Sequence, residues 1–182
     1  MPKLAEEDNQ IVKNQLGKEP RGLIDIPVRC SYGYPVVLET KPLIRDKEGF
    51  EVFPTLYWLS CPKRVEELAG LEADGYVEQL EKEIASTPAL KEKYRENEER
   101  YLQAQKSLLA EDDLEFIEEK RLGDALSKGI GGIESDEHLK CLHLHLAHQL
   151  ADENVVGELI ETRFDLKDCP SENVRCEEFL RD

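Results

Sequence analysis

Val52-Phe53-Pro54-Thr55-Leu56-Tyr57-Trp58-Leu59 is the segment of the chain richest in strand-forming residues. From Pro62 onward the apolar residues recur every three or four positions, which predicts helices instead. Upstream, residues 36–38 indicate a second strand, and turn-forming residues at 46–49 lie between the two strands. We therefore expect a β-hairpin over residues 36–59 that leads directly into a helical body.

Helical spacing continues through most of the remaining chain, and Gly17 is placed to end a first helix. The expected helices cover residues 5–16, 62–73, 76–86, 87–110, 113–127, 135–151 and 155–163. The fold class that follows is α+β, a mostly helical body with a small antiparallel β-hairpin or sheet. A chain of 182 residues predicts a single domain over 1–182, with its motifs in about 10–150 and a C-terminal helix and tail in 151–182.

The charge balance limits the classes of partner. Lys and Arg total 24 against 40 Asp and Glu, a formal net charge of -16. Such acidity argues against general nucleic-acid binding and against anionic membrane surfaces. There is no apolar run of about 18 residues and no signal-peptide core near the N-terminus, so we expect a cytoplasmic protein. Five cysteines in that compartment indicate thiols or metal ligands rather than structural disulfides.

The expected helix over 135–151 carries most of the candidate ligands. On a helical wheel, four potential ligands share one stripe: His138, Cys141, His145 and His148. His143 is expected on the opposite, leucine-bearing side. Imidazole and thiolate bind zinc, and spacings of three, four and seven residues bring side chains together, so the stripe predicts a metal site. The alternative is surface or interface histidines beside a small buried cysteine.

The other cysteines lie at segment boundaries. Cys61 precedes Pro62 at an expected helix N-terminus, where the helix dipole and the nearby Lys63 and Arg64 lower the pKa of a thiol, so it could be a ligand or a reactive thiolate. The alternative is a buried cysteine before an ordinary helix that starts with a proline. Cys30 lies in a turn rich in Gly and Pro, and Cys169 precedes a proline. For both of these an unligated thiol is the alternative. Cys176 is expected to be inert.

The sequence leaves two further possibilities, an anion site and a surface for a protein partner. Gly129-Ile130-Gly131-Gly132 leads into an expected helix N-terminus and could present N–H groups to an anion, with Arg21, Arg29 and Lys140 completing the charge. The alternative is an ordinary linker and helix cap. The charge-rich helix near 91–112 is expected to be a solvated face, or else a surface for a protein partner.

Several separated stretches together resemble a known bacterial family. They are 15–22, Arg29-Cys30 with Gly33 and Pro35, 53–62, Leu71-Glu72 with Gly75, and 140–143 with Ala147-His148. On these stretches the chain resembles the domain of unknown function 501 family over about residues 10–150. The resemblance implies a bacterial cytosolic protein and assigns no activity. It also implies that the shared motifs include Cys30, Cys61, Cys141, His143 and His148.

Three functional hypotheses follow. The first is a metal-binding protein that uses Cys30, Cys61, Cys141 and His148, with zinc as the metal, or an iron–sulfur cluster if Cys169 joins. His143 and His145 are further candidates. The second is an enzyme with Cys61 as thiolate nucleophile and a histidine of 143–148 as base. The third is an adaptor that binds a protein partner through its charged helix. The sequence does not indicate an oligomeric state.

Overall fold

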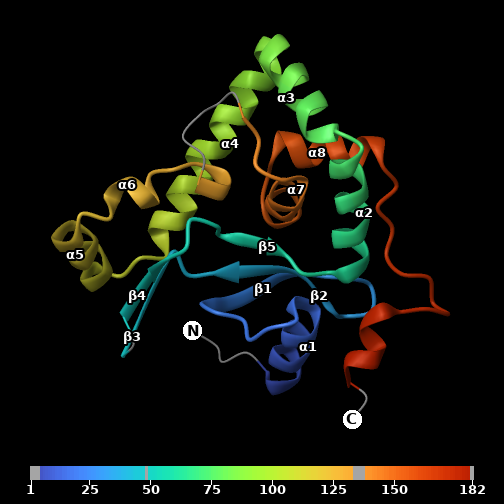
Figure 1. Cartoon of the computed structure of the whole chain (residues 1–182), viewed down its shortest axis with the longest axis horizontal. Helices are drawn as coiled ribbons and strands as arrows, with labels where there is room; N and C mark the ends of the chain where they lie inside the picture. Colours follow the sequence, from blue (N-terminus) through green and yellow to red (C-terminus); the bar gives the residue numbers. More distant parts are fainter. Residues whose placement is uncertain (1–4, 48, 133–137, 181–182) are drawn as a thin grey trace.

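The computed structural model describes residues 5–47, 49–132 and 138–180. It confirms the α+β class, because helices dominate and the strands form two small antiparallel sheets. Figure 1 shows the helices stacked above the sheets, with α1 below them. The chain ends, near α1, lie on the same side of the molecule.

The larger sheet has three strands in the order β1-β2-β5. Their bounds are Leu23–Arg29 for β1, Pro35–Thr40 for β2 and Tyr57–Leu59 for β5. β2 and β5 are the two strands of the expected hairpin, and Val37 pairs with Leu59. A second hairpin of β3 (Leu43–Asp46) and β4 (Gly49–Val52) is inserted between them. In place of the single hairpin expected over 36–59, the structure therefore has two antiparallel pairings, β2 with β5 and β3 with β4.

Strand β1 was not part of the expected hairpin. Pro27 lies within it and offers no N–H to a ladder, which is why the sequence reads as an interrupted apolar run. β1 tolerates the proline because it is an edge strand whose pairing with β2 shifts register repeatedly. A proline confined to an irregular edge strand leaves the central strand β2 intact.

The helices follow the expected order, with two differences. Their bounds are α1 Glu6–Leu16, α2 Pro62–Ala73, α3 Tyr76–Ser86, α4 Pro88–Ser107, α5 Glu111–Lys120, α6 Gly123–Leu126, α7 Leu142–Ala151 and α8 Val155–Arg163, with short 3₁₀ turns η1 at Ile130–Gly132 and η2 at Arg175–Leu180. Gly17 ends α1 in the left-handed conformation, at φ 67°. The helix expected over 113–127 is split where Arg121 turns left-handed.

The helix expected from Ser135 begins only at Leu142. Residues 138–141 are not helical, and Cys141 has extended backbone angles at the N-cap. Residues 135–137 lie outside the described part of the chain. The predicted four-residue stripe is therefore wrong, because His138 and Cys141 do not follow the helical repeat of His145 and His148.

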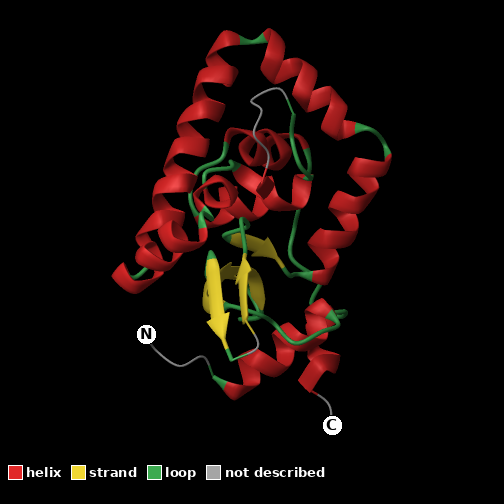
Figure 2. Ribbon diagram, turned by 60° about the vertical axis from the view of Figure 1, so that its left-hand side comes forward, coloured by secondary structure: helices red, strands yellow, loops and turns green. Residues whose placement is uncertain are grey.

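Helix α7 occupies the centre of the molecule. It contacts the three-stranded sheet on one side and α2 and α8 on others, beneath the arch of α2, α3 and α4 that Figure 2 shows from a second direction. The main core cluster joins sheet and helices and includes Val37, Leu68, Leu142 and Leu146. Each such buried side chain contributes about 2 kcal/mol. The burial of α7 on nearly all sides fixes the positions of its histidines.

A smaller core cluster lies on the α1 side of the sheet. Val12, Ile26 and Leu38 form it, and half-buried Leu16, Leu23 and Trp58 pack against them. β2 thus contributes Val37 to the main cluster and Leu38 to the smaller one, as the alternation of a strand requires.

The charged helix α4 has a buried face that the sequence conceals. Its inward residues are Tyr94, Asn97, Tyr101 and Gln105, at helical spacing. The Tyr101 hydroxyl donates to the Pro54 carbonyl at 2.9 Å and accepts the Leu56 N–H at 2.6 Å. In the described ranges, no helix has both the length and the apolar character needed to cross a membrane.

Candidate functional site

Three chemically active side chains meet where α2 ends and α7 begins. They are Glu72, Cys141 and His143, and one ligand atom from each lies within 4.8 Å of the other two. All three are half-buried, so the junction is open to solvent on one side. The extended backbone of Cys141 brings its thiol to the same side as His143, which is why the wheel placed them wrongly on opposite faces.

Glu72 organises the junction. Its Oε1 accepts the Leu142 N–H at 2.6 Å and lies 2.8 Å from His143 Nδ1. A carboxylate at a helix N-terminus is stabilised by the unpaired N–H groups and by the helix dipole. Glu72 lies off the apolar stripe of α2, a position that by itself predicts a solvent-facing side chain. It is instead the cap of another helix, a role that only the packing of α2 on α7 reveals.

His143 is held at both ring nitrogens. Nδ1 faces Glu72, and Nε2 lies 3.0 Å from the Val65 carbonyl oxygen, which can only accept. The neighbouring Cys141 sulfur, the Val65 carbonyl and the Glu72 charge together raise the pKa of His143 to about 9, against the effect of partial burial. Without a metal, His143 is therefore an imidazolium at neutral pH.

His148 and His145 belong to the core. His148 stacks on Tyr57 at 5.7 Å between ring centroids and contacts Tyr101 edge-on at 5.2 Å. Its Nδ1 accepts from the Asn154 amide at 3.1 Å. Burial lowers the pKa of His148 to about 4 and that of His145 to about 3. Both rings are fully buried, and His148 Nε2 lies 3.7 Å from the carboxylate of the exposed Asp152.

Cys61 is at the N-cap of α2, as expected, and it is buried, which agrees with the alternative of a buried cysteine rather than with a reactive thiolate. Burial raises the pKa of the Cys61 thiol, although the backbone N–H groups of Arg64 and Lys63 favour the thiolate. The helix dipole is outweighed because the sulfur is removed from water. A buried, protonated thiol does not support Cys61 as a nucleophile.

The C-terminal tail brings two more cysteines to Cys30 and Cys61. Asp168 accepts the Ser31 N–H at 2.8 Å, and the Tyr32 hydroxyl donates to the Cys169 carbonyl at 3.0 Å. Burial and the neighbouring thiols of Cys61, Cys30 and Cys169 raise the pKa of Cys176 to about 11, although a hydrogen bond from Gln15 opposes this. Among the described residues, no three of these four sulfurs lie within 4.8 Å of one another.

The expected ligand set is therefore divided between two ends of α2. Cys61 precedes the helix and Glu72 lies near its last residue, about 16 Å away along the axis. Cys30 and Cys169 are near Cys61, Cys141 is near Glu72, and His148 is in the core. The structure does not bring Cys30, Cys61, Cys141 and His148 together.

Residues 26–162 of the 182 match the family described as "Protein of unknown function (DUF501)". The chain belongs to the DUF501 family. No curated protein and no solved structure matches the chain. Glu72, Cys141 and His143 all lie inside the DUF501 match, whereas Cys169 and Cys176 lie beyond it. All three members of the junction also belong to the stretches that carry the family resemblance.

The anion-site candidates of this DUF501 protein do not converge. Arg21 pairs with Glu51, and Arg29 pairs with Asp8 at 2.8 Å. Arg29 is the last residue of β1 and Arg21 precedes its first residue, so the strand separates the two arginines by roughly 20 Å. Lys140 packs near Gly131, but the helix that follows begins at Leu142 and is already capped by the Glu72 carboxylate. An anion at that N-terminus would be repelled by Glu72.

Proposed function

We propose that this DUF501 protein binds a divalent metal ion, zinc by its ligand chemistry, through Cys141 Sγ, His143 Nδ1 and a Glu72 carboxylate oxygen. The supporting observation is that these three donor atoms, each of a type that zinc prefers, lie within 4.8 Å of one another. Zinc bonds of about 2.0 to 2.3 Å place ligand atoms at such separations after small side-chain rotations.

The second nitrogen of His143 supports the same proposal. A metal-ligating histidine almost always donates its other N–H to a carbonyl or carboxylate, which fixes the ring and its tautomer. Val65 O is in that position, 3.0 Å from Nε2. Metal binding would release the proton from His143 Nδ1. The metal ion would then take the place of that proton beside the Glu72 carboxylate.

Three protein ligands leave a fourth tetrahedral position for water or a substrate group, as in catalytic zinc sites. The half-exposed junction is compatible with that access. An iron–sulfur cluster would need several thiolates, and this junction contributes one. We place the protein in the cytoplasm because the five cysteines of the chain are free thiols.

A second candidate function uses the same residues without metal. Cys141 precedes α7 and its sulfur lies beside the His143 ring, the pairing of a cysteine with a histidine that enzymes with a cysteine nucleophile use. This replaces the hypothesis built on Cys61. It predicts rapid alkylation of Cys141 in metal-free protein, slowed by zinc.

The deciding experiment is metal analysis and zinc titration of protein purified without chelator or metal-affinity steps. We expect about one zinc per chain, lost in Cys141→Ser and in His143→Gln. Cys169→Ser is the matched control, since Cys169 is also half-buried but lies outside the junction. No zinc in the unmodified protein, or equal zinc in Cys141→Ser, would overturn the metal proposal and leave the thiolate candidate.

A further inference from the structure

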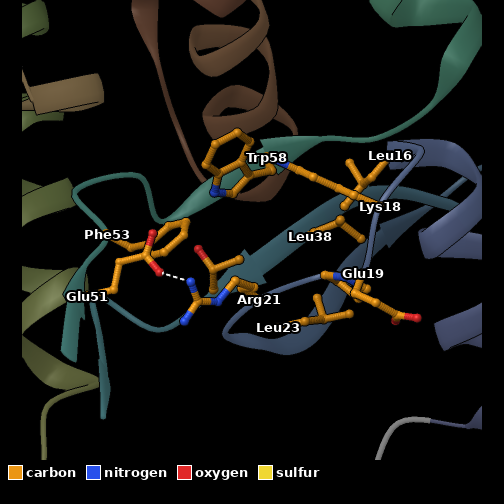
Figure 3. Close-up of a pocket in the computed structure, with 11 residues that line it drawn as sticks. Leu16, Lys18, Glu19, Arg21, Leu23, Leu38, Glu51, Phe53 and Trp58 are labelled. Carbon is orange, nitrogen blue, oxygen red and sulfur yellow. Dashed lines mark ion pairs between the residues drawn. The ribbon is translucent and has the colours of Figure 1, made fainter. Parts of the chain in front are cut away.

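A cavity lies on the α1 side of the sheet, across the sheet from the junction of α2 and α7. Its volume is about 160 Å³, and the loop after α1 encloses it against β2, β4 and β5. Figure 3 shows its apolar walls, formed by Leu16, Leu23, Leu38, Phe53 and Trp58. An apolar cavity of similar size can hold a benzene-sized molecule.

The acidic groups at the cavity are already paired. Glu51 forms an ion pair with Arg21, drawn as a dashed line in Figure 3, and Glu19 pairs with Lys13 outside the cavity. Lys18 makes no ion pair or hydrogen bond with any described residue, and its side chain reaches toward Trp58 in Figure 3. One uncompensated cation therefore borders an apolar cavity in a protein whose net charge is -16.

Two buried polar atoms at the cavity have no hydrogen-bond partner among the described residues, Glu51 Oε2, which forms the ion pair with Arg21, and the Trp58 indole nitrogen. The Thr40 hydroxyl donates to the Thr55 carbonyl at 2.8 Å, so it is already used. The Trp58 indole N–H is buried and has no acceptor within the described ranges. Leaving a buried donor unpaired is unfavourable by about 1–3 kcal/mol, and an acceptor entering the cavity would remove that penalty.

We propose that this cavity binds a small carboxylic acid with an apolar body of about six carbon atoms. The hydrocarbon part lies against the leucines and Trp58, and the carboxylate pairs with Lys18 at the open side. A neutral or cationic ligand of the same length leaves Lys18 without a partner. The site is separate from the metal junction, because its walls belong to the smaller core cluster.

Trp58 makes this proposal directly measurable, because it is the one tryptophan of the chain. Its emission is followed while hexanoate, 1-hexanol or hexylamine is added to the full-length protein, and calorimetry repeats each titration. We expect saturable hexanoate binding with a Kd on the order of 1 mM. Hexanol should bind at least about fivefold more weakly, and hexylamine should bind more weakly still.

Three variants locate the ligand. Lys18→Gln should weaken hexanoate binding by about five- to tenfold and remove the preference over hexanol. Lys82→Gln, at an exposed lysine on α3, is the matched control and should change nothing. Leu23→Phe fills the cavity and should abolish binding of all three probes. The absence of saturable hexanoate binding overturns the proposal, as does equal affinity for hexanol or an unaffected Lys18→Gln variant.

Discussion

Helix α7 places His143 at a polar junction and His145 in the core, only two residues apart. His143 lies between Glu72 and the Val65 carbonyl, and its pKa is raised to about 9. His145 is fully buried, neither ring nitrogen has a hydrogen-bond partner in the described structure, and its pKa is lowered to about 3. The same side chain is thus a cation in one place and a neutral core residue in the other.

The difference shows that environment, rather than residue type, identifies the functional histidine. A titratable group beside a charge partner and a thiol, open to solvent, can exchange a proton or a metal. A histidine enclosed by Tyr94 and the leucines of α7 can do neither without disrupting the core. Breaking this contrast by mutation or by pH tests the assignment.

Replacing each histidine with lysine, which carries a permanent charge, should give the largest difference in stability between positions 143 and 145. His145→Lys buries a cation with no partner and should destabilise the protein by more than about 4 kcal/mol, so that it fails to fold. His143→Lys keeps a cation beside Glu72 and should cost about 1 kcal/mol. Circular dichroism and urea unfolding measure both. Near-native stability of His145→Lys would contradict the buried, dry environment assigned to that residue.

The stability of the protein should also depend on pH in opposite ways through the buried His145 and His148 and through His143. The pKa values of His145 and His148 are below the unfolded value near 6.5, so stability falls as pH drops below about 6.5, by roughly 2 kcal/mol per histidine at pH 5. The pKa of His143 is raised, so its contribution is complete below about 6.5 and is lost as pH rises through about 9.

Urea unfolding across this pH range measures the loss of stability in acid, the acid limb, separately from the loss in alkali, the alkaline limb. His145→Leu should reduce the loss of stability in acid, and His143→Gln should remove part of the loss in alkali. An acid limb unchanged in His145→Leu would show that other groups cause the loss of stability in acid.

Removing the charge of Glu72 should have the smallest effect on stability among these changes. Glu72→Gln should lower the pKa of His143 only part of the way from about 9, since the larger contribution of Cys141 remains, and should reduce stability at neutral pH by about 1 kcal/mol. NMR titration of the histidine ring protons follows the pKa. Glu78→Gln, at an exposed acid on α3, is the control. A His143 pKa that stays near 9 in Glu72→Gln would assign the shift to Cys141 and Val65 alone.

Much of the fold follows from local sequence signals. The apolar spacing from Pro62 onward and Gly17 after α1 predicted helices correctly. Strand β1 was not predicted, because Pro27 interrupts its apolar pattern. The strand order β1-β2-β5 was not predicted either, because pairing across an inserted hairpin is not a local property of the sequence.

The junction was only half predictable. Cys141 and His143 stood out by residue type, but the helix wheel separated them, since nothing local showed that Cys141 precedes the helix. Glu72 is 69 residues away from Cys141 in the chain, and only the packing of α2 on α7 brings its carboxylate to the helix start. The helix wheel predicts His148 as a ligand because it does not distinguish a core-facing side of a helix from one that faces a site.

X-ray absorption spectroscopy of the zinc-loaded protein shows whether Cys141 binds the metal, because it counts sulfur ligands. We expect one sulfur at about 2.3 Å and nitrogen or oxygen ligands at about 2.0–2.2 Å, with the sulfur lost in Cys141→Ser. Four sulfurs would contradict this expectation and place the metal at Cys30, Cys61, Cys169 and Cys176. A spectrum without sulfur would also contradict it, because Cys141 would then not be a ligand.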